Sequence, residues 1–209
     1  PRPRLARHWS DYQLACFDFV ANGTGNGVVI ARAGSGKTTL LEHIITLVPP
    51  TLHLVFLAFY KSIAKELKTR IEPSPNRTVS TLNALGNANT REALPDAIFD
   101  EHKIDMLWKD MISSADPETL ISLDEWRGDI WKIAGLLRKT LSPLTEDSVA
   151  YIADRHNVAI TDDQLPFIAK WAIRLVEVCR STTSMIDYDD QVDFPATGIV
   201  SVSKVFDWV

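Results

Sequence analysis

The residues best suited to chemistry lie at positions 31–39, where the sequence is ARAGSGKTT. Gly34 and Gly36 lack a Cβ atom and tolerate positive φ, which lets neighbouring backbone amides turn toward phosphate oxygens. Lys37 follows at once and can reach the β- and γ-phosphates of a nucleotide, while Thr38 can place its hydroxyl on Mg²⁺. The pattern predicts a nucleotide site in which Lys37 and Thr38 make the catalytic contacts and Thr38 is the metal ligand.

The spacing is that of a phosphate-binding loop, GxxxxGK[ST], with Ala31 at the first glycine position. The residues expected to line the phosphates are Ala33, Gly34, Ser35, Gly36, Lys37, Thr38 and Thr39. A glycine-rich turn that binds nothing is the alternative interpretation. Phosphate binding is favoured because Lys-Thr directly follows the last glycine and because a helix, with its unpaired amides and positive dipole end, is expected to start there.

The segments around the loop alternate between helix and strand patterns. Ser10 followed by Gln13 is typical of a capping box at a helix start, and Asn22-Gly23 is expected to end that helix. Short apolar runs predict buried strands, and apolar residues at helical spacing predict helices between them. The expected strands are residues 27–31, 52–58 and 78–80, and the expected helices include residues 37–48 and 63–71. This alternation implies an α/β fold with a parallel sheet.

Residues 87–182 have a different character, because amphipathic helix patterns replace the strand-like runs. The expected helices are residues 104–113, 118–141 and 163–180. Trp108, Trp126, Trp131 and Trp171 fall in this stretch, and on amphipathic helices we expect them in a hydrophobic core. We interpret the stretch as an all-helical subdomain inserted into the α/β domain. Residues 201–209 return to a strand-like pattern.

Composition limits the class of protein. The chain has 209 residues, of which 45% are hydrophobic and 23% charged, as is ordinary for a globular protein. No apolar run reaches the length of a membrane-spanning helix, and no secretory signal follows Pro1. Cys16 and Cys179 lack metal-ligand spacing and are expected to be buried thiols in a reducing cytosol. The net charge of −5 does not favour a nucleic-acid partner, although an acidic protein can carry a basic groove.

The stretch around the loop resembles the UvrD/Rep-type superfamily 1 DNA helicases, whose loop is AGAGSGKT and has glycine where this chain has Arg32. Gln13 is similar to the glutamine of the helicase Q motif. The resemblance implies that its carboxamide contacts adenine, since that group both donates and accepts. LAFYKSIAKEL at residues 57–67 is similar to a helicase motif that contacts single-stranded DNA, and is closest to the variant of F-box DNA helicases and their phage relatives.

The resemblance implies DNA contacts in two places. At the first, Phe59 or Tyr60 faces a base, while Lys61, Ser62 and the helix amides meet phosphate. The second is STLNALG at residues 80–86, which is similar to the family's T-F-H-S-L-G segment with asparagine in place of histidine. The residues implied there are Thr81 and Asn83.

The resemblance also implies how the chain is organised. Residues 1–86 are expected to form the first part of a RecA-like ATP-binding motor domain, residues 87–182 the helical insertion, and residues 183–209 the return to the motor domain. FDWV at the end is similar to the strand that leads into the family's acidic V-D-E-x-Q-D motif. We therefore expect an N-terminal portion of a helicase, without that motif or the second motor domain, that is inactive in hydrolysis by itself. The implied cofactors are ATP and Mg²⁺, the implied partner is single-stranded DNA, and the implied location is the cytoplasm or nucleoid.

Two alternatives stay open. One is a complete P-loop NTPase of another family, in which Asp187, Asp189 or Asp190 is the magnesium-side carboxylate. Such a carboxylate is expected at the end of a buried strand, and the residues STTS at positions 181–184 are not strand-like. The other is a nucleotide-binding module without catalysis.

Overall fold

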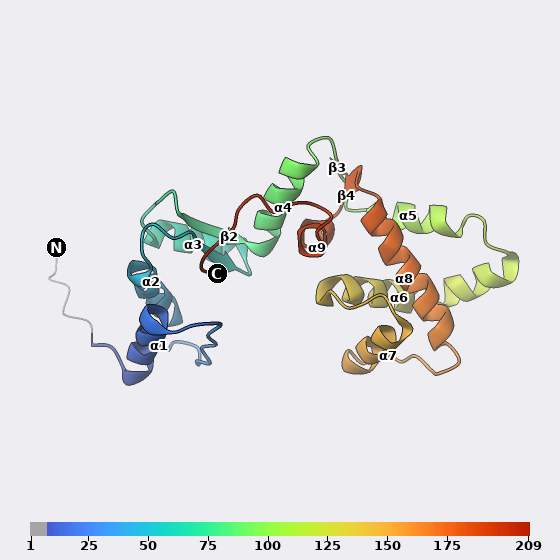
Figure 1. Ribbon diagram of the computed structural model, residues 1–209. Coiled ribbons are helices and arrows are strands. Elements are labelled where there is room, and N and C mark those ends of the chain that lie inside the picture. Colours follow the sequence, from blue (N-terminus) through green and yellow to red (C-terminus); the bar gives the residue numbers. More distant parts are fainter. Residues whose placement is uncertain (1–7) are drawn as a thin grey trace. The chain divides into compact units, whose positions relative to one another are not determined.

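The computed structural model describes residues 8–209, which form two compact units (Figure 1). The first unit holds the described residues up to Thr81 together with Val205–Val209, and the second is Leu82–Lys204. The second unit is therefore wider on both sides than the predicted insertion at residues 87–182. Within residues 8–209, no helix is both long enough and apolar enough to cross a membrane.

The first unit is built around two parallel strands. Its elements are α1 (Asp11–Asn22), α2 (Lys37–Leu47), β1 (Leu54–Ala58), α3 (Lys61–Arg70) and β2 (Arg77–Thr81). In the register of the pair, Leu54 lies opposite Arg77 and Ala58 opposite Thr81. Because parallel strands need a crossover connection, α3 joins the end of β1 to the start of β2. The predicted strands at residues 52–58 and 78–80 and the predicted helix at residues 37–48 are confirmed.

A small hydrophobic core anchors the helix that follows the glycine-rich loop. Its buried residues are Ile45, Val48, Leu54, Ala58, Ala64, Leu67 and Ile71. α2 contributes Ile45, so this helix is fixed against β1 and α3 by apolar contact. Trp208 packs against the same core, and its carbonyl accepts the Val55 amide at 2.9 Å. The segment predicted as strand-like at residues 201–209 thus forms a single parallel bridge, between Trp208 and Leu54.

Residues 27–31 do not form the predicted buried strand. The segment has no regular secondary structure, and Val28 and Ile30 are 85% and 96% exposed. An apolar run shows that a segment suits a sheet, but a parallel strand also needs a neighbour for its backbone groups. No strand among residues 8–209 pairs with residues 27–31. The prediction is wrong for this structure because it assumed a ladder partner that the described residues do not supply.

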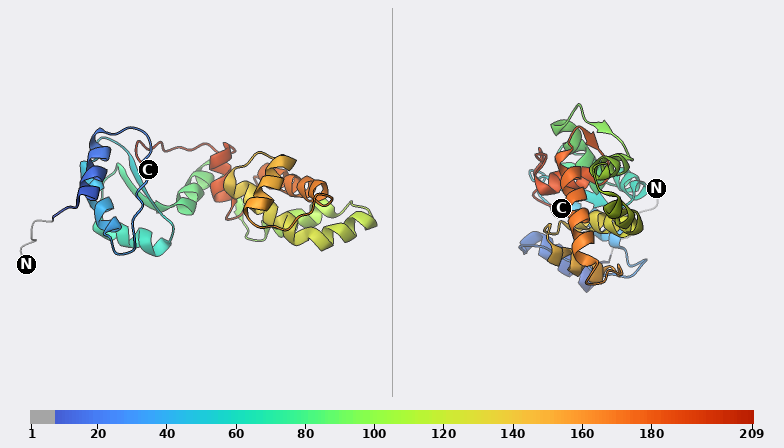
Figure 2. Two further views of the ribbon diagram at one scale, coloured as in Figure 1. Left: turned by 90° about the horizontal axis from the view of Figure 1, so that it is seen from below. Right: turned by 90° about the vertical axis from the view of Figure 1, so that its right-hand side faces the viewer.

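The second unit is mainly helical. Its elements are α4 (Leu82–Ala93), β3 (Ile98–Phe99), α5 (Lys103–Ile112), α6 (Pro117–Thr140), α7 (Glu146–Arg155), α8 (Leu165–Ser181), β4 (Met185–Ile186) and α9 (Asp190–Thr197). α6 and α8 lie side by side and make the most extensive helix contact of this unit (Figure 2). The helices predicted at residues 104–113, 118–141 and 163–180 are confirmed. Missing from the prediction are α7 and the short parallel pair of β3 with β4.

The tryptophans of this unit belong to its core, as predicted. Trp108 is buried, while Trp126, Trp131 and Trp171 are partly buried and pack against the same cluster. Cys179 is also buried in this cluster, whereas Cys16 in α1 is only half-buried. The prediction of two buried thiols is therefore confirmed for Cys179 and wrong for Cys16.

A glycine allows two helices of the second unit to approach closely. Gly86 in α4 faces the backbone of α9, and a Cβ atom at this position would overlap the carbonyl oxygen of Gln191. Glycine is thus required by contact with a neighbouring backbone rather than by its own φ angle. The packing of α4 on α9 depends on this position.

Candidate nucleotide-binding site

The glycine-rich loop forms a tight turn at the start of α2. Gly34 and Gly36 both have positive φ, of 77° and 83°, in the left-handed region that glycine adopts without strain. Within the turn the Arg32 carbonyl accepts from the Ser35 amide at 3.4 Å and from the Ser35 hydroxyl at 2.8 Å. Gly36 is the residue that caps α2, so the turn feeds directly into the helix.

Most amides of this turn are open to a ligand. Among the described residues, the backbone amides of Gly34, Gly36, Lys37 and Thr38 donate to no protein acceptor. The first amides of a helix have no partner within it, and the helix dipole adds partial positive charge at the same end. Several unpaired N–H groups converging on one helix start are the physical requirement for binding phosphate.

Lys37 lies across the loop that it follows. Its ammonium donates to the carbonyl of Ala31 at 2.9 Å and to the carbonyl of Arg32 at 2.8 Å. An ammonium carries three N–H groups, so one remains for a further acceptor. The side chain therefore ties the loop into its turn and places a positive charge beside the open amides.

The loop and α1 line one cavity of ≈ 430 Å³, a volume in the range of small-molecule sites. α1 contributes Tyr12, Gln13 and Cys16 to its lining, and the loop contributes Gly36 and Lys37. The exposed apolar segment at residues 28–30 lines it as well. The structure thus brings together two regions that the sequence analysis linked only through a family resemblance.

Gln13 is fixed in place by the start of α1. The predicted capping box is confirmed: the Ser10 hydroxyl accepts the Gln13 amide at 3.4 Å, and Gln13 Oε1 accepts the Ser10 amide at 3.0 Å. Gln13 Nε2 makes no hydrogen bond within the described part of the chain. It lies beside the loop, since a Cβ atom at Gly36 would be 3.6 Å away from it. The carboxamide is held by its oxygen side and keeps a donor for a ligand.

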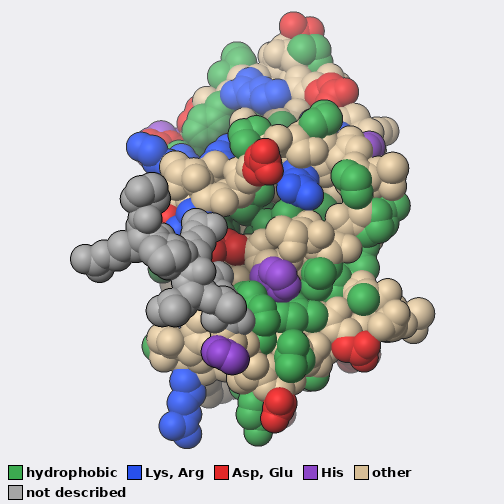
Figure 3. All heavy atoms as spheres, turned by 90° about the vertical axis from the view of Figure 1, so that its left-hand side faces the viewer, with side chains coloured by type: hydrophobic (Ala, Val, Ile, Leu, Met, Phe, Trp, Pro, Cys, Tyr) green, Lys and Arg blue, Asp and Glu red, His purple; other side chains and the backbone are tan. Residues whose placement is uncertain are grey.

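A pair of exposed aromatic side chains follows β1. Phe59 is 87% and Tyr60 61% exposed, and their rings meet edge to face with centroids 4.9 Å apart. Lys61 and Ser62 follow in the first turn of α3, and no side chain caps this helix. On the face drawn in Figure 3, basic side chains are scattered among acidic and apolar ones and do not form a single basic patch. The region after β1 therefore offers a nucleic acid two ring faces, the helix amides and the exposed ammonium of Lys61.

The other two residues named for DNA contact lie in different surroundings. Thr81 ends β2 and is buried, at 7% exposed. Asn83 belongs to the second unit, where its side-chain amide donates to the Tyr188 carbonyl at 3.4 Å. Thr81 is therefore much less open than Phe59 and Tyr60, while Asn83 is exposed but has its side-chain amide engaged by a backbone carbonyl.

Asp187 and Asp190 take part in a buried ion cluster of the second unit. Arg138 donates to Asp187 at 3.1 Å and to Asp190 at 2.6 Å, and Lys103 donates to the other oxygen of Asp190 at 2.6 Å. Burial, together with the Asp187 charge, raises the pKa of Asp190 to about 6. Burial also opposes ionisation of Asp187, but the hydrogen bonds and charge of Arg138 outweigh it and lower the pKa of that carboxyl. Both carboxylates are engaged by protein donors, which makes them poor candidates for a magnesium ligand.

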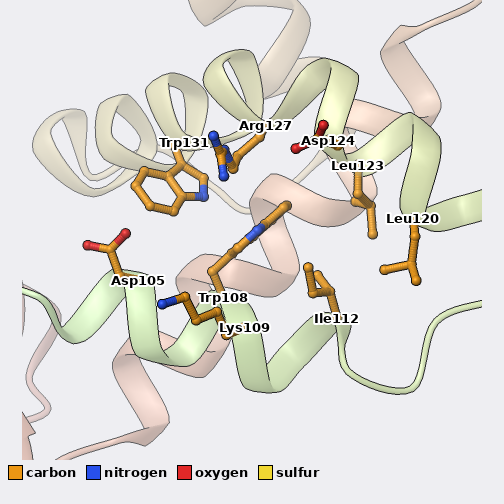
Figure 4. Close-up of a pocket in the computed structure, with 9 residues that line it drawn as sticks. All are labelled: Asp105, Trp108, Lys109, Ile112, Leu120, Leu123, Asp124, Arg127 and Trp131. Atoms are coloured by element: carbon orange, nitrogen blue, oxygen red, sulfur yellow. The ribbon is translucent and has the colours of Figure 1, made fainter.

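A second, smaller cavity of ≈ 140 Å³ lies between α5 and α6 (Figure 4). Trp108 and Trp131 form part of its wall, with ring centroids 6.1 Å apart. The remaining wall includes two acidic and two basic side chains, from Asp105, Lys109, Asp124 and Arg127. Because these charges balance, the cavity favours neither an anion nor a cation.

Comparisons of this chain with models of protein families, with curated proteins and with solved structures find no match. The interpretation of the site therefore depends on its geometry. The strongest geometric feature is the shared cavity of Gln13, the open loop amides and Lys37.

Proposed function

We propose that this chain binds ATP with Mg²⁺ at the glycine-rich loop and is the ATP-binding part of a DNA helicase that moves along single strands. The observation that carries the proposal is the single cavity lined by both Gln13 and the loop. A base-recognising carboxamide and a phosphate-binding turn are the two ends that a nucleotide site requires. A location in the cytoplasm or on the nucleoid follows from this proposal.

Each residue of the loop has a part that fits its geometry. The open amides of Gly34, Gly36 and Lys37 donate to phosphate oxygens at the helix start. The free N–H of the Lys37 ammonium adds a charge-assisted hydrogen bond to the same oxygens. The exposed Thr38 hydroxyl is the group that would hold Mg²⁺. Bound ATP supplies free energy when its terminal phosphate is cleaved.

The lining of the cavity favours binding over turnover. It contains no aspartate or glutamate among the described residues, although phosphoryl transfer needs a group that positions water and helps to hold the metal. We therefore expect the 209-residue chain to bind ATP and to show no ATPase activity above background, even with DNA present. This lining is also the observation that supports the second candidate function, a nucleotide-binding module without catalysis. Robust ATP hydrolysis by this chain would argue against the expected lack of ATPase activity and against the non-catalytic module.

Isothermal titration calorimetry with Mg²⁺-ATP tests nucleotide binding directly. Lys37→Ala removes a charged donor, and such a bond is worth about 1.5–3 kcal/mol, so affinity should fall about 10- to 150-fold. Lys65→Ala removes an exposed lysine from α3 outside the cavity and serves as the matched control. Equal affinities for Lys37→Ala and the parent chain would remove the loop from the proposal.

Fluorescence anisotropy with a single-stranded oligonucleotide tests the DNA part. Stacking of one base on an aromatic ring is worth about 1–3 kcal/mol, so Phe59→Ala and Tyr60→Ala should weaken binding about 5- to 150-fold at constant salt. Tyr151→Ala is the control, because Tyr151 in α7 is exposed to the same 61% as Tyr60. The assignment of DNA contacts to Phe59 and Tyr60 fails if Phe59→Ala and Tyr60→Ala bind the oligonucleotide as tightly as Tyr151→Ala.

A further inference from the structure

The cavity has a part that the loop does not account for. In the proposed nucleotide site the amides between Gly34 and Thr38 bind the phosphate groups, so the rest of the nucleotide must lie against the other lining residues of the cavity. That remaining lining includes Tyr12, Gln13 and Cys16 of α1 and the apolar segment at residues 28–30. It is predominantly apolar, which suits a flat base rather than more phosphate.

Tyr12 is the aromatic side chain of this lining. It is 87% exposed and makes no hydrogen bond or ring contact within the described residues, so its ring faces are open. Exposure of an aromatic ring to water is unfavourable in free energy, and a base stacked on the ring would remove part of this cost. Tyr12 also directly precedes Gln13, whose amide donor is free at the same wall of the cavity.

We propose that Tyr12 is the stacking platform for the nucleotide base. The inference rests on the proposed nucleotide site. Stacking favours the larger purine rings over pyrimidines.

The test compares three ligands on the full chain: Mg²⁺-ATP, Mg²⁺-CTP and inorganic tripolyphosphate. Tyr12→Ala should weaken ATP binding about 5- to 150-fold and reduce the preference for ATP over CTP, while tripolyphosphate affinity stays unchanged. Tyr12→Phe keeps the ring and should retain ATP affinity. Because Tyr12 is so exposed, neither variant removes a core contact.

The outcomes separate this inference from the proposed function. If the parent chain binds neither ATP nor tripolyphosphate, the nucleotide site itself is wrong. If both bind and Tyr12→Ala leaves ATP affinity unchanged, or weakens both ligands equally, the loop stands and the stacking inference is overturned. Lys37→Ala is the counterpart, because it should weaken ATP and tripolyphosphate together.

The two cysteines supply an independent measurement. Cys16 lies one helical turn after Tyr12 and lines the same cavity, so a base stacked on Tyr12 should cover its thiol. Cys179 is fully buried, and burial raises its pKa to about 11, so it should not react with iodoacetamide. ATP should therefore slow alkylation of the parent chain, and tripolyphosphate should not. Equal protection by the two ligands, or none by saturating ATP, would place the base elsewhere.

Discussion

Removing the charge of Lys103 should strongly destabilise the second unit. Lys103 opens α5 and is fully buried. Its ammonium donates to the Cys179 carbonyl at 2.9 Å, the Thr182 carbonyl at 2.8 Å and Asp190 at 2.6 Å. These bonds join α5 to the end of α8 and the start of α9. The change Lys103→Met keeps an unbranched side chain, one heavy atom shorter, and removes all three donors.

The expected loss follows from these contacts. Hydrogen bonds to a charged group are worth about 1.5–3 kcal/mol each, so three sum to about 4.5–9 kcal/mol. The variant recovers part of this, because a buried ammonium costs several kcal/mol to desolvate and methionine does not. The net loss should be about 3–5 kcal/mol, the size seen when one partner of a buried pair is removed. Domains of this kind have only about 5–15 kcal/mol in total.

Urea denaturation followed by tryptophan fluorescence measures this loss, since four tryptophans report on the second unit. Lys109→Met is the matched control: it makes the same exchange on the same helix at an exposed residue, and should change the free energy of unfolding by less than about 0.5 kcal/mol. Adding Asp190→Asn to Lys103→Met should cost less than the two single losses combined. A loss below about 1 kcal/mol for Lys103→Met would refute the reasoning.

Three further outcomes are expected. Gly86→Ala should lower the free energy of unfolding by about 1–3 kcal/mol, because its Cβ overlaps the Gln191 carbonyl. Gly135→Ala in the open part of α6 should instead raise the free energy of unfolding by about 0.5–1 kcal/mol. Thermal unfolding measures both changes, and shifts of the same sign would contradict the packing argument. Gly36→Ala forces a side chain to φ 83° at a cost of about 1–2 kcal/mol, and calorimetry should show weaker ATP binding; unchanged affinity would mean that the turn is not used. Folding raises the pKa of Asp190 from 3.8 to about 6, so the folded protein binds this proton more tightly than the unfolded chain, and the group's contribution to stability should fall as pH rises through that interval. Asp190→Asn should remove this slope from denaturation midpoints measured between those pH values, and an identical slope in the variant would exclude Asp190 as its source.

Features whose causes are local could be predicted from the sequence. The capping box at Ser10 needs only two side chains three residues apart, and both of its hydrogen bonds are present. Gly34 and Gly36 both have positive φ, and α2 begins directly after them. In each case a single turn of chain contains all the atoms that decide the outcome.

Features that depend on a partner far along the chain could not be predicted from the sequence. The strand pattern at residues 27–31 lacks a neighbour, and β3 with β4 are strands of two residues each, too short for a periodic signal. Lys103 has the sequence surroundings of an ordinary exposed lysine, yet contacts far along the chain bury it. The buried state of Asp187 and Asp190 likewise depends on Arg138, which no local spacing connects to them.

Consecutive amides of β1 point to opposite sides, and this has a consequence for how the chain can be rearranged. Leu54 donates to Asn76 beside β2, while Val55 donates to Trp208 on the other edge. The chain therefore leaves the first unit at the end of β2, after Thr81, on one edge of β1. It returns to this unit at Val205, on the other edge of β1. Both neighbours run parallel to β1, so Thr81 lies level with the end of β1 whereas Trp208 lies level with its start. A glycine-serine tether must therefore cross two strand spacings of about 4.8 Å and also run back along the whole length of β1. Replacing Leu82–Lys204 with such a tether should leave a nucleotide-binding unit whose own strand pairings are intact.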